Sequence, residues 1–593
     1  MAMISGLSLH CECDPVTYPR TDTSKIRKSI KAHECRLCPR YLTILTSLIS
    51  QFFMRLSTST LILAVVGGTL AAPGPGSHIL AARQSSAGDP GGAVQCPADT
   101  QWFDQPIDHA STNSSQTFKQ RYQIDTSNFK EGGPILFYQS PEATDIACIS
   151  ELLFMNWAKE LGGIVATLEH WYFGQSLPFG NNSYTLDNLK PFTLDNVMQD
   201  AVHFLDFVKK NVTGAAKSKT IVAGGSYGGF LAPVFRQNYP DTFFGAWGIA
   251  GPFRSLGTVD EVGAELHNWY NYVQSTYAHR SLEAFDRIRN GFAQVKQLID
   301  TGNNATLTKE LSLCHPPSNS SDDLATFASF LVSSYTTMSQ FNGLPPAVFF
   351  NVSGNSLDVV VNDTLAAPTP LAGINQTLWH AHGLDAVNGC LNYTDAQNSG
   401  FGVQEIPFMW AQCNWFPLNL AIANDSIFNI GSPGLGMSSS PSATCETLFN
   451  LTQVNGADVL TRYNVTREDI GNSTHIIFSE NEYDPTTSVA VPPDWLGDNV
   501  STDIDKSVVL FVAGTGHGQD LARPNATDPS SLTAARNIEF NIFKAWLAGA
   551  NETISGISTT ITASATAIGS ATSFSASATA TSSATGTASS ASL

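Results

Sequence analysis

A glycine-rich segment between two apolar runs constrains the fold of this 593-residue chain most strongly. Residues 220–229 read TIVAGGSYGG, and a helix-compatible run follows them. An abrupt turn from strand to helix puts its middle residue, Ser226, in a strained conformation, and small neighbours keep the two segments from colliding. The serine hydroxyl then stands at the carboxyl edge of a sheet, where it can act as a nucleophile. The alternative interpretation is a glycine-rich turn with an idle serine.

Short apolar runs alternate with helical patterns along much of the chain. Such runs are typical of strands covered on both faces. The candidates are Pro134–Tyr138, Gly163–Leu168, Thr220–Ala223, Thr474–Ser479 and Ser507–Val512. Helices are predicted after Thr193, a suitable N-cap, and over Thr533–Ala548, where Gly549 ends the pattern. This alternation predicts a mostly parallel sheet flanked by helices, and with the serine turn it predicts the α/β-hydrolase fold.

A hydroxyl is a poor nucleophile, so a general base is needed. In this fold the chain order is serine, acid, histidine. His517 is the only histidine after His475, and it lies in a glycine-rich loop just past the candidate strand Ser507–Val512. That position is the carboxyl end of a strand, where α/β sheets place their chemistry. We therefore predict that His517 is the general base; the alternative is a solvated loop histidine.

The acid is expected at the end of the preceding strand. Residues 474–484 carry an apolar run into Glu480, Glu482 and Asp484. Asp484 precedes a proline and is the predicted acid, although an Asp-Pro pair also initiates turns. Glu480 and Glu482 are rival acids, and Asp520 is a weaker one.

Two backbone N–H groups are expected to stabilise the oxyanion. One is that of Tyr227, at the start of the helix that follows the serine. The second should come from the loop after the strand that ends at Tyr138, where Ser140 and Glu142 are the candidates. Pro141, which lies between them, has no N–H and cannot donate.

Composition and rhythm divide the chain into distinct parts. The predicted parts are a dispensable extension (1–53), a signal peptide (54–72), a hydrolase core (95–252 and 466–550), an inserted, largely helical cap (253–465) and a disordered Ser/Thr/Ala-rich tail (554–593). The signal peptide is inferred because Arg55 precedes an apolar run and then small residues. The cap is inferred because its stretch breaks the strand–helix rhythm and opens on a helix-like segment over about 259–299.

The first 53 residues allow two other interpretations. Cys11, Cys13, Cys35 and Cys38 have spacings that can be read as a zinc site. Residues 42–66 can be joined into a membrane anchor, but Arg55 and a run of hydroxyl residues interrupt it.

Cysteines and sequons indicate an exported protein. Beyond residue 72 the cysteines are Cys96, Cys148, Cys314, Cys390, Cys413 and Cys445. An even number predicts three disulfides, with the pairing left open. Asn-x-Ser/Thr sequons occur, for example, at Asn113, Asn211, Asn304, Asn351, Asn424, Asn464 and Asn551. We therefore predict a glycoprotein that is secreted, or vacuolar or lysosomal.

The charge balance restricts the partners. Acidic residues outnumber basic ones, 50 against 31, for a net charge of −19. This balance disfavours a nucleic-acid partner, because phosphate binding needs clustered Lys and Arg, and it suits a soluble protein in an acidic medium. No metal, cofactor or membrane partner is implied for the mature chain, and a homodimer is left open.

Several motifs resemble those of the Pro-X carboxypeptidase family of serine peptidases, which includes lysosomal prolyl carboxypeptidase, dipeptidyl peptidase II and fungal acid prolyl endopeptidases. The motifs are ILFY (135–138), LEHWYFGQSLPFG (168–180), TLDNVMQDAVHFLDFVKK (193–210), AGGSYGGFLAPVFRQNYP (223–240), IFSENEYDP (477–485) and GHGQDL (516–521). The family's serine, aspartate and histidine fall on Ser226, Asp484 and His517. The resemblance implies cleavage after proline beneath an inserted helical domain. It also implies a substrate pocket, for which the candidate residues are Phe230, Trp410 and Trp415.

We therefore expect a secreted serine-type peptidase that cleaves peptides through an acyl-enzyme, with an exopeptidase favoured over an endopeptidase. An esterase or lipase that uses the same three residues is one alternative. A catalytically inactive hydrolase-fold binding protein is another. It is considered because residues 140–143 read SPEA where the family has Gly-Asn-Glu-Gly.

Overall fold

The computed structural model describes the central part of the chain. The described residues are 100–549 except 111–115, 259–261, 264–265, 319, 345–351, 353–354, 384–385, 387, 395–404, 432–440 and 498–504. The predicted extension (1–53), its four cysteines, the predicted signal peptide (54–72) and the predicted tail (554–593) lie outside them. Within the described part, no helix is both long and apolar enough to cross a membrane.

An eight-stranded sheet forms the centre of the fold, in the order β1-β2-β4-β3-β5-β6-β7-β8. The strands are β1 (Gln101–Pro106), β2 (Thr117–Asp125), β3 (Ile135–Gln139), β4 (Ile164–Leu168), β5 (Thr220–Gly225), β6 (Gly245–Ile249), β7 (Ile476–Asn481) and β8 (Val508–Val512). β2 pairs antiparallel with both β1 and β4, and every pair from β4 through β8 is parallel. This mostly parallel sheet, flanked by helices, is the α/β-hydrolase fold that the sequence predicts.

All five strands predicted from apolar runs are present as β3, β4, β5, β7 and β8, with ends shifted by a residue or two. β1, β2 and β6 were not predicted. β6 reads GAWGI, and its two glycines interrupt the apolar run that would mark it. β1 and β2 have exposed positions between buried ones, so neither forms a continuous apolar run.

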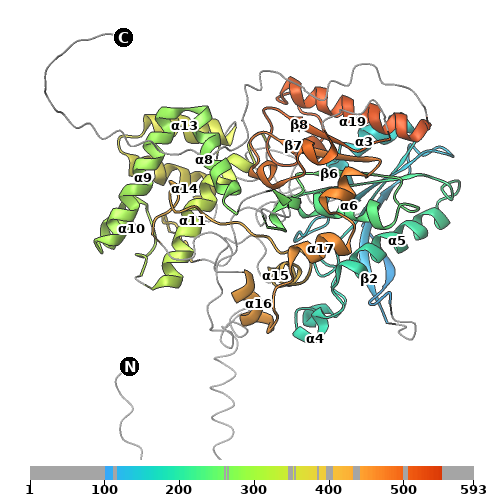
Figure 1. Ribbon diagram of the computed structural model, residues 1–593, viewed down its shortest axis with the longest axis horizontal. Coiled ribbons are helices and arrows are strands. Elements are labelled where there is room, and N and C mark those ends of the chain that lie inside the picture. The colour runs from blue at the N-terminus through green and yellow to red at the C-terminus, as the bar shows by residue number, and fades with distance from the viewer. Residues whose placement is uncertain are drawn as a thin grey trace, which may run out of the picture. The chain divides into compact units, whose positions relative to one another are not determined.

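Helices cover both faces of the sheet. Side chains on one face, such as Phe137 and Val222, pack with residues of α5 (Leu194–Asn211) and α6 (Tyr227–Asn238). Alternate side chains of the same strands pack on the other face with α3 (Phe154–Leu161) and α19 (Ser530–Ala548). Figure 1 shows α19 and α5 on opposite sides of the strands. The period-two alternation of strands accounts for this division of one sheet between two apolar layers.

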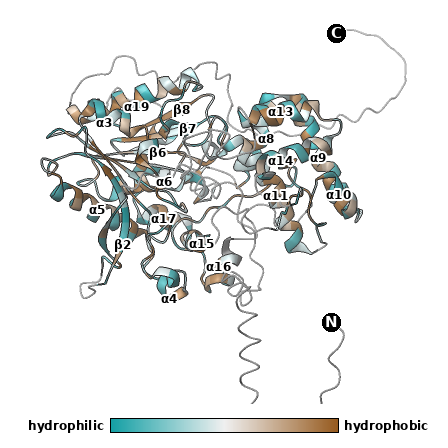
Figure 2. Cartoon of the chain, turned by 180° about the vertical axis from the view of Figure 1, so that it is seen from behind, coloured by the Kyte–Doolittle hydropathy of each residue, from teal (hydrophilic) through white to brown (hydrophobic). Residues whose placement is uncertain are grey.

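Two helices have the ends that their sequences predict. The hydroxyl of Thr193 accepts a hydrogen bond from the N–H of Asn196 at 3.2 Å and caps α5. α19 ends at Gly549, which has a φ of 64° in the left-handed region. Figure 2 shows hydrophilic and hydrophobic segments alternating along α19, as expected for a helix with one buried face.

The chain between β6 and β7 is largely helical. Its helices of seven or more residues are α8 (Asn268–Arg280), α9 (Leu282–Asp300), α10 (Asn304–Glu310), α11 (Ser321–Gln340), α13 (Ser356–Ala366), α14 (Pro370–His382), α15 (Glu405–Asn414), α16 (Pro441–Phe449) and α17 (Gly456–Arg462). α8 to α14 enclose a hydrophobic cluster separate from those of the sheet. The helix-like segment expected over about 259–299 is two helices, because Ser281 ends α8 and its hydroxyl caps α9.

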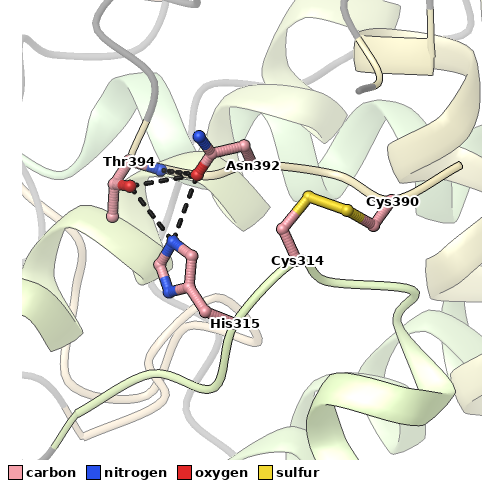
Figure 3. Close-up of a disulfide and its surroundings, with 5 residues drawn as sticks. All are labelled: Cys314, His315, Cys390, Asn392 and Thr394. Carbon is pink, nitrogen blue, oxygen red and sulfur yellow. Dashed lines mark hydrogen bonds between the residues drawn. A yellow bond between two sulfur atoms is a disulfide. The ribbon is translucent and has the colours of Figure 1, made fainter. Parts of the chain in front are cut away.

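Disulfides fasten this helical part. Cys314 pairs with Cys390, and Cys413 pairs with Cys445. Beside the first disulfide, the ring of His315 contacts the side chain of Asn392 (Figure 3). The segment after Cys314 and the segment after Cys390 are therefore joined by a covalent bond and a polar contact. Cys148 is also disulfide-bonded, and the sixth predicted cysteine, Cys96, lies outside the described residues.

Candidate active site

Ser226 occupies the turn that the glycine-rich segment predicts. It separates β5 from α6 and has a φ of 59° and a ψ of −122°, a conformation that a non-glycine residue rarely adopts. A Cβ on Gly224 would lie 2.2 Å from the carbonyl oxygen of Gly228, so only glycine fits there. The N–H of Ser226 donates to the carbonyl of Ile249 at 2.9 Å, which ties the turn to β6.

His517 and Asp484 form a buried pair. The Nδ1 atom of His517 lies 2.5 Å from Oδ2 of Asp484, and their side chains are 1% and 0% exposed. The other carboxylate oxygen of Asp484 accepts from the N–H of Thr486 at 2.9 Å. Because a carboxylate only accepts, Nδ1 carries the proton and Nε2 is left as an acceptor. Nε2 is buried and has no hydrogen-bond partner among the described residues.

The rival acids occupy other positions. Glu482 accepts from the N–H of Gly514 at 2.6 Å, so it braces the loop that carries His517. Glu480 and Asp520 are buried, and burial is the main cause that raises the pKa of each. Among the described residues, only Asp484 forms a side-chain hydrogen bond with the imidazole.

Sheet topology brings the three predicted residues to one edge. Ser226 follows β5, Asp484 follows β7 and His517 follows β8, and these strands are parallel with β6 between β5 and β7. Neighbouring strands lie about 4.8 Å apart, so the three loops share the carboxyl edge. A close contact supports this arrangement, because a Cβ on Gly225 would lie 3.2 Å from the side chain of Leu521, which lies just after His517.

The loop after β3 carries Ser140 and Glu142, the two candidates for the second oxyanion donor. The N–H of Ser140 donates to the carbonyl of Leu168 at 3.2 Å, and its hydroxyl contacts that of Thr167 at 2.9 Å. Ser140 therefore cannot donate to a substrate without breaking these bonds. Glu142 is 1% exposed, and burial raises the pKa of its carboxyl to about 8; a hydrogen bond from its own N–H offsets this only in part.

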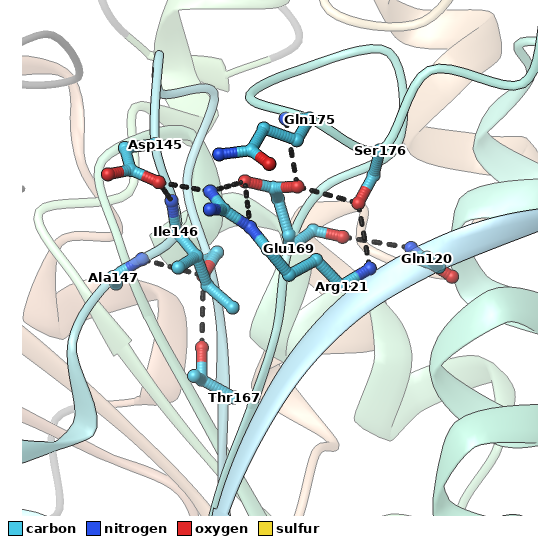
Figure 4. A network of polar contacts seen from close by, with 10 residues as sticks. Gln120, Arg121, Asp145, Ile146, Ala147, Thr167, Glu169, Gln175 and Ser176 are labelled. Atoms are coloured by element: carbon cyan, nitrogen blue, oxygen red, sulfur yellow. Dashed lines mark hydrogen bonds and ion pairs between the residues drawn. The ribbon is translucent and has the colours of Figure 1, made fainter. Parts of the chain in front are cut away.

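A buried ion-pair network holds the same loop (Figure 4). The guanidinium of Arg121, on β2, contacts both Asp145 in the loop and Glu169 after β4. Glu169 also accepts from the Ser176 hydroxyl at 2.6 Å. Burial alone would lower the pKa of Arg121, but the charges and hydrogen bonds of Glu169 and Asp145 outweigh burial and raise it. The network fixes the loop through paired and hydrogen-bonded charges, as buried ions require.

Tyr227, whose N–H is the first predicted oxyanion donor, has a fixed side chain. Its hydroxyl accepts from Nε1 of Trp415 at 3.1 Å and lies 3.4 Å from Nε2 of His170. Burial lowers the pKa of His170 to about 4, so its ring is neutral. Its Nδ1 donates to the carbonyl of Trp171 at 2.9 Å, which leaves Nε2 able to accept from the Tyr227 hydroxyl. As the first residue of α6, Tyr227 has an N–H with no acceptor four residues earlier in the helix.

The three predicted pocket residues are all buried. Phe230 on α6 and Trp415 just after α15 belong to the same aromatic cluster as Tyr227. The ring of Phe416 links them, with its centroid 5.2 Å from that of Phe230 and 4.9 Å from that of Tyr227. Trp410 packs against Phe449 and donates to a backbone carbonyl. The structure thus brings Phe230 and Trp415 beside the serine turn, and their roles toward substrate stay predictions.

Some residues at this edge carry no sequence signal. The end of α11 contacts the loops of His517 and Asp484 through backbone carbonyls and one serine hydroxyl, which no residue pattern marks. Arg121 could not be found either, because the strand that turns it inward, β2, has no continuous apolar run to mark it. Within the described residues, no group of three or more His, Cys, Asp or Glu could hold a metal ion.

This arrangement can perform nucleophilic acyl transfer. A strained serine, an imidazole with an open Nε2 and a carboxylate that orients the imidazole are the three parts that activate a hydroxyl. In a site of this kind the serine gives its proton to the imidazole Nε2, and the carboxylate stabilises the imidazolium that results.

Comparisons with known proteins show the family of this chain. The profile of the family "Serine carboxypeptidase S28" matches residues 105–539. "Lysosomal Pro-X carboxypeptidase" from Homo sapiens is 27% identical over 459 residues, which cover 75% of this chain and 88% of that protein. "Probable extracellular serine carboxypeptidase" from Arthroderma benhamiae is 28% identical over 224 residues, 35% of this chain and 29% of that protein. Because the family profile spans most of the sequence, this chain belongs to the serine carboxypeptidase S28 family of serine peptidases.

Proposed function

We propose that this peptidase is exported from the cell and cleaves peptides after proline, with Ser226 as nucleophile, His517 as general base and Asp484 as the acid that orients it. An exopeptidase is favoured over an endopeptidase. The observation that carries the assignment is the buried pair of His517 and Asp484, 2.5 Å apart, at the sheet edge that holds the strained serine. Among the described residues, Nε2 of the imidazole has no hydrogen-bond partner.

The proposed reaction has two matched halves. Nε2 of His517 accepts the Ser226 proton while the oxygen attacks the peptide carbonyl, and the tetrahedral oxyanion forms. The imidazolium then protonates the leaving amine, and the ester of the acyl-enzyme remains. Water repeats the sequence, giving its proton to His517 and releasing the acid product with the serine hydroxyl restored.

We assign the oxyanion to backbone donors. One donor is the N–H of Tyr227, the first residue of α6. The positive end of the helix dipole lies there and favours a developing negative charge. For the second donor, the N–H of Ser140 is engaged with the carbonyl of Leu168 and that of Glu142 with its own carboxyl. Glu142 is the remaining candidate, because its bond lies within one residue and no bond to another strand has to break. The Arg121 network would hold this loop in place as charge develops.

The proline preference rests on relatives and on aromatic residues. Relatives that align with three quarters of this chain are named Pro-X carboxypeptidases. Beside the serine turn, Phe230 and Trp415 offer flat apolar rings, which suit the apolar pyrrolidine ring of proline. Phe230 and Trp415, with Trp410 five residues earlier on α15, are therefore proposed to shape the pocket for the residue before the cleaved bond.

Export is proposed from independent features. Relatives are named lysosomal or extracellular, and the described part of the chain holds two complete disulfides. Disulfides persist in oxidising compartments. The sequon residues Asn211, Asn424 and Asn464 are exposed and available to a glycosylating enzyme. A signal peptide over 54–72 would direct the chain there.

A substrate panel tests the function. Wild type and Ser226→Ala are compared at acidic pH on Pro-X and Ala-X peptides, each free or blocked at either end, and on short-chain esters. We expect Pro-X peptides with one free end to be cleaved fastest by wild type and no turnover by Ser226→Ala. Equal rates for both proteins would refute the assignment of Ser226. Preference for esters would favour a lipase or esterase, and equal cleavage of blocked peptides would favour an endopeptidase.

A further inference from the structure

The last turn of α11 meets both loops that carry the proposed base and acid. The carbonyl of Gln340, the final residue of the helix, accepts the backbone N–H of His517 at 2.7 Å. The hydroxyl of Ser339 donates to the carbonyl of Tyr483 at 2.8 Å, directly before Asp484. One helix end therefore holds the backbone of both partners in the buried pair.

Residues just past the helix extend this contact. The ring of Phe341 lies edge-on to the imidazole of His517, with centroids 5.6 Å apart and planes at 87°. The side-chain amide of Gln519 donates to the carbonyl of Gly343 at 3.0 Å. A Cβ on Gly516 would lie 2.2 Å from the carbonyl oxygen of Asn342, so the approach of the two segments depends on glycine at 516.

Helix electrostatics adds a charge effect to the geometry. The last carbonyls of a helix have no partner within it and carry a partial negative charge. One of these carbonyls at the end of α11, that of Gln340, accepts the N–H of His517. The negative end of the helix dipole therefore lies at His517. His517 becomes positive when it takes the serine proton, so this end of α11 stabilises the charged intermediate more than the resting state.

A second helix of the same region touches the acid loop. The hydroxyl of Tyr272, on α8, donates to the carbonyl of Glu482 at 2.7 Å. α8 and α11 share one hydrophobic cluster, to which Tyr483 also packs. The inserted helices thus form one support behind the loop of Asp484.

From these contacts we propose that residues 339–343 at the end of α11 are positioning residues for the catalytic pair. They keep the imidazole of His517 and the carboxylate of Asp484 aligned with each other and with Ser226, so turnover depends on docking of the inserted helices against the sheet edge. The inference rests on the proposed roles of these three residues.

A pair of serine variants on one helix tests the proposal. Ser339→Ala removes the bond to Tyr483. Ser334→Ala, five residues earlier on α11, removes an equally buried hydroxyl that bonds only within the helical region. We expect Ser339→Ala to lower kcat about 10-fold with KM nearly unchanged, because small misplacements of catalytic groups are costly. Ser334→Ala should keep the wild-type kcat.

A second readout separates positioning from stability. The rate constant for inactivation by a fluorophosphonate depends on activation of the serine and not on peptide binding, and it should fall with kcat in Ser339→Ala. Gly516→Ala, which forces Asn342 away, should lower it further, by about 100-fold. Melting temperatures of all variants show whether each is folded; if Gly516→Ala does not fold, the serine pair alone decides.

The outcomes distinguish this inference from the proposed function. A wild-type kcat and inactivation rate in Ser339→Ala, or an equal loss in Ser334→Ala, would overturn the positioning role. Ser226→Ala is measured in parallel. If it is inactive while Ser339→Ala behaves as wild type, only the role of α11 fails; if Ser226→Ala is active, the proposed function fails first.

Discussion

The sheet and the helices inserted between β6 and β7 contribute to the candidate active site in different ways. The sheet supplies side chains: Ser226, Asp484 and His517 each follow a parallel strand at its carboxyl end. The inserted helices supply mainly backbone and hydroxyl contacts, from Gln340 and Ser339 at the end of α11. The sheet therefore determines which chemistry is possible, and the helices determine how well its parts are aligned.

The two regions also hold themselves together differently. The sheet buries apolar layers on both faces and a charged network at Arg121. The described residues of the helical region form their own hydrophobic cluster and two complete disulfides. Changes of Ser226, Asp484 or His517 should therefore abolish the chemistry, whereas changes in either region away from the carboxyl edge and the end of α11 should first affect stability. The following predictions test that difference, in order of expected effect.

The largest effect is expected from Asp484→Asn. An asparagine would keep the shape but present an amide where Nδ1 now donates, so the proton would move to Nε2 and the imidazole could no longer accept from Ser226. We expect kcat to fall about 10⁴-fold, as this exchange does in serine-protease triads, with KM little changed. Steady-state kinetics on a cleaved Pro-X peptide measure it. A loss smaller than about 10-fold would assign the role of acid to another residue.

The next effect is expected on stability, from Arg121→Met. This change leaves Glu169, which is 1% exposed, without its counter-charge, and such losses cost about 3–5 kcal/mol. Arg462→Met is the matched control, because its ion pair with Asp195 is exposed and worth about 0–1 kcal/mol. Urea unfolding of both variants gives the comparison. Equal losses would mean that the buried network does not stabilise the sheet region.

A moderate effect is expected in the helical region. Replacing both Cys314 and Cys390 by serine opens a link between residues 76 positions apart, and loss of such a disulfide typically costs about 2–4 kcal/mol. Because the disulfide lies away from α11's end, kcat at 25 °C should stay within about twofold of wild type while the variant is folded. Thermal unfolding and kinetics are measured together. A large fall in kcat without unfolding would show that this disulfide also affects the alignment of the candidate active site.

The smallest effect, counted per pH unit, is expected on the free energy of unfolding when the pH changes the protonation of Glu142. Burial raises its pKa in the folded protein to about 8 from 4.5, so folding is favoured by its proton. This stability is fully present below about pH 4.5 and is lost as the pH rises toward 8, by about 1 kcal/mol per pH unit. Glu142→Gln cannot lose a proton, so its melting temperature relative to wild type should rise from pH 5 to pH 8.

An exposed carboxyl serves as the control for that series. Asp187 pairs with Lys190 at the surface, and its hydrogen bond to that lysine is the main cause that lowers its pKa. Asp187→Asn should not change the melting temperature relative to wild type between pH 5 and pH 8. A flat difference for Glu142→Gln as well would show that Glu142 is ionised in the folded protein throughout this range.

Much of the sheet region could be predicted from the sequence because its signals are local. Continuous apolar runs mark β3, β4, β5, β7 and β8, and glycines mark the turn at Ser226. Cap residues such as Thr193 and Gly549 mark helix ends. The order of serine, acid and histidine along the chain then places three side chains at one edge without any knowledge of distances.

The contacts of the helical region could not be predicted in this way. The carbonyl of Gln340 and the hydroxyl of Ser339 would look the same in any helix, and their partners lie more than a hundred residues away in sequence. The engagement of Ser140 with Leu168 is also a backbone contact that residue type does not encode. Sequence patterns report burial and turns, whereas these contacts follow from tertiary packing.

Covalent labelling of the purified protein measures whether His517 activates Ser226. The protein is treated with a fluorophosphonate, and the modified peptide is identified by mass spectrometry, with Ser226→Ala and His517→Ala in parallel. We expect one modified serine, Ser226, in wild type, no label in Ser226→Ala and strongly slowed labelling in His517→Ala. Labelling of a different serine, or equal labelling of wild type and His517→Ala, would contradict it.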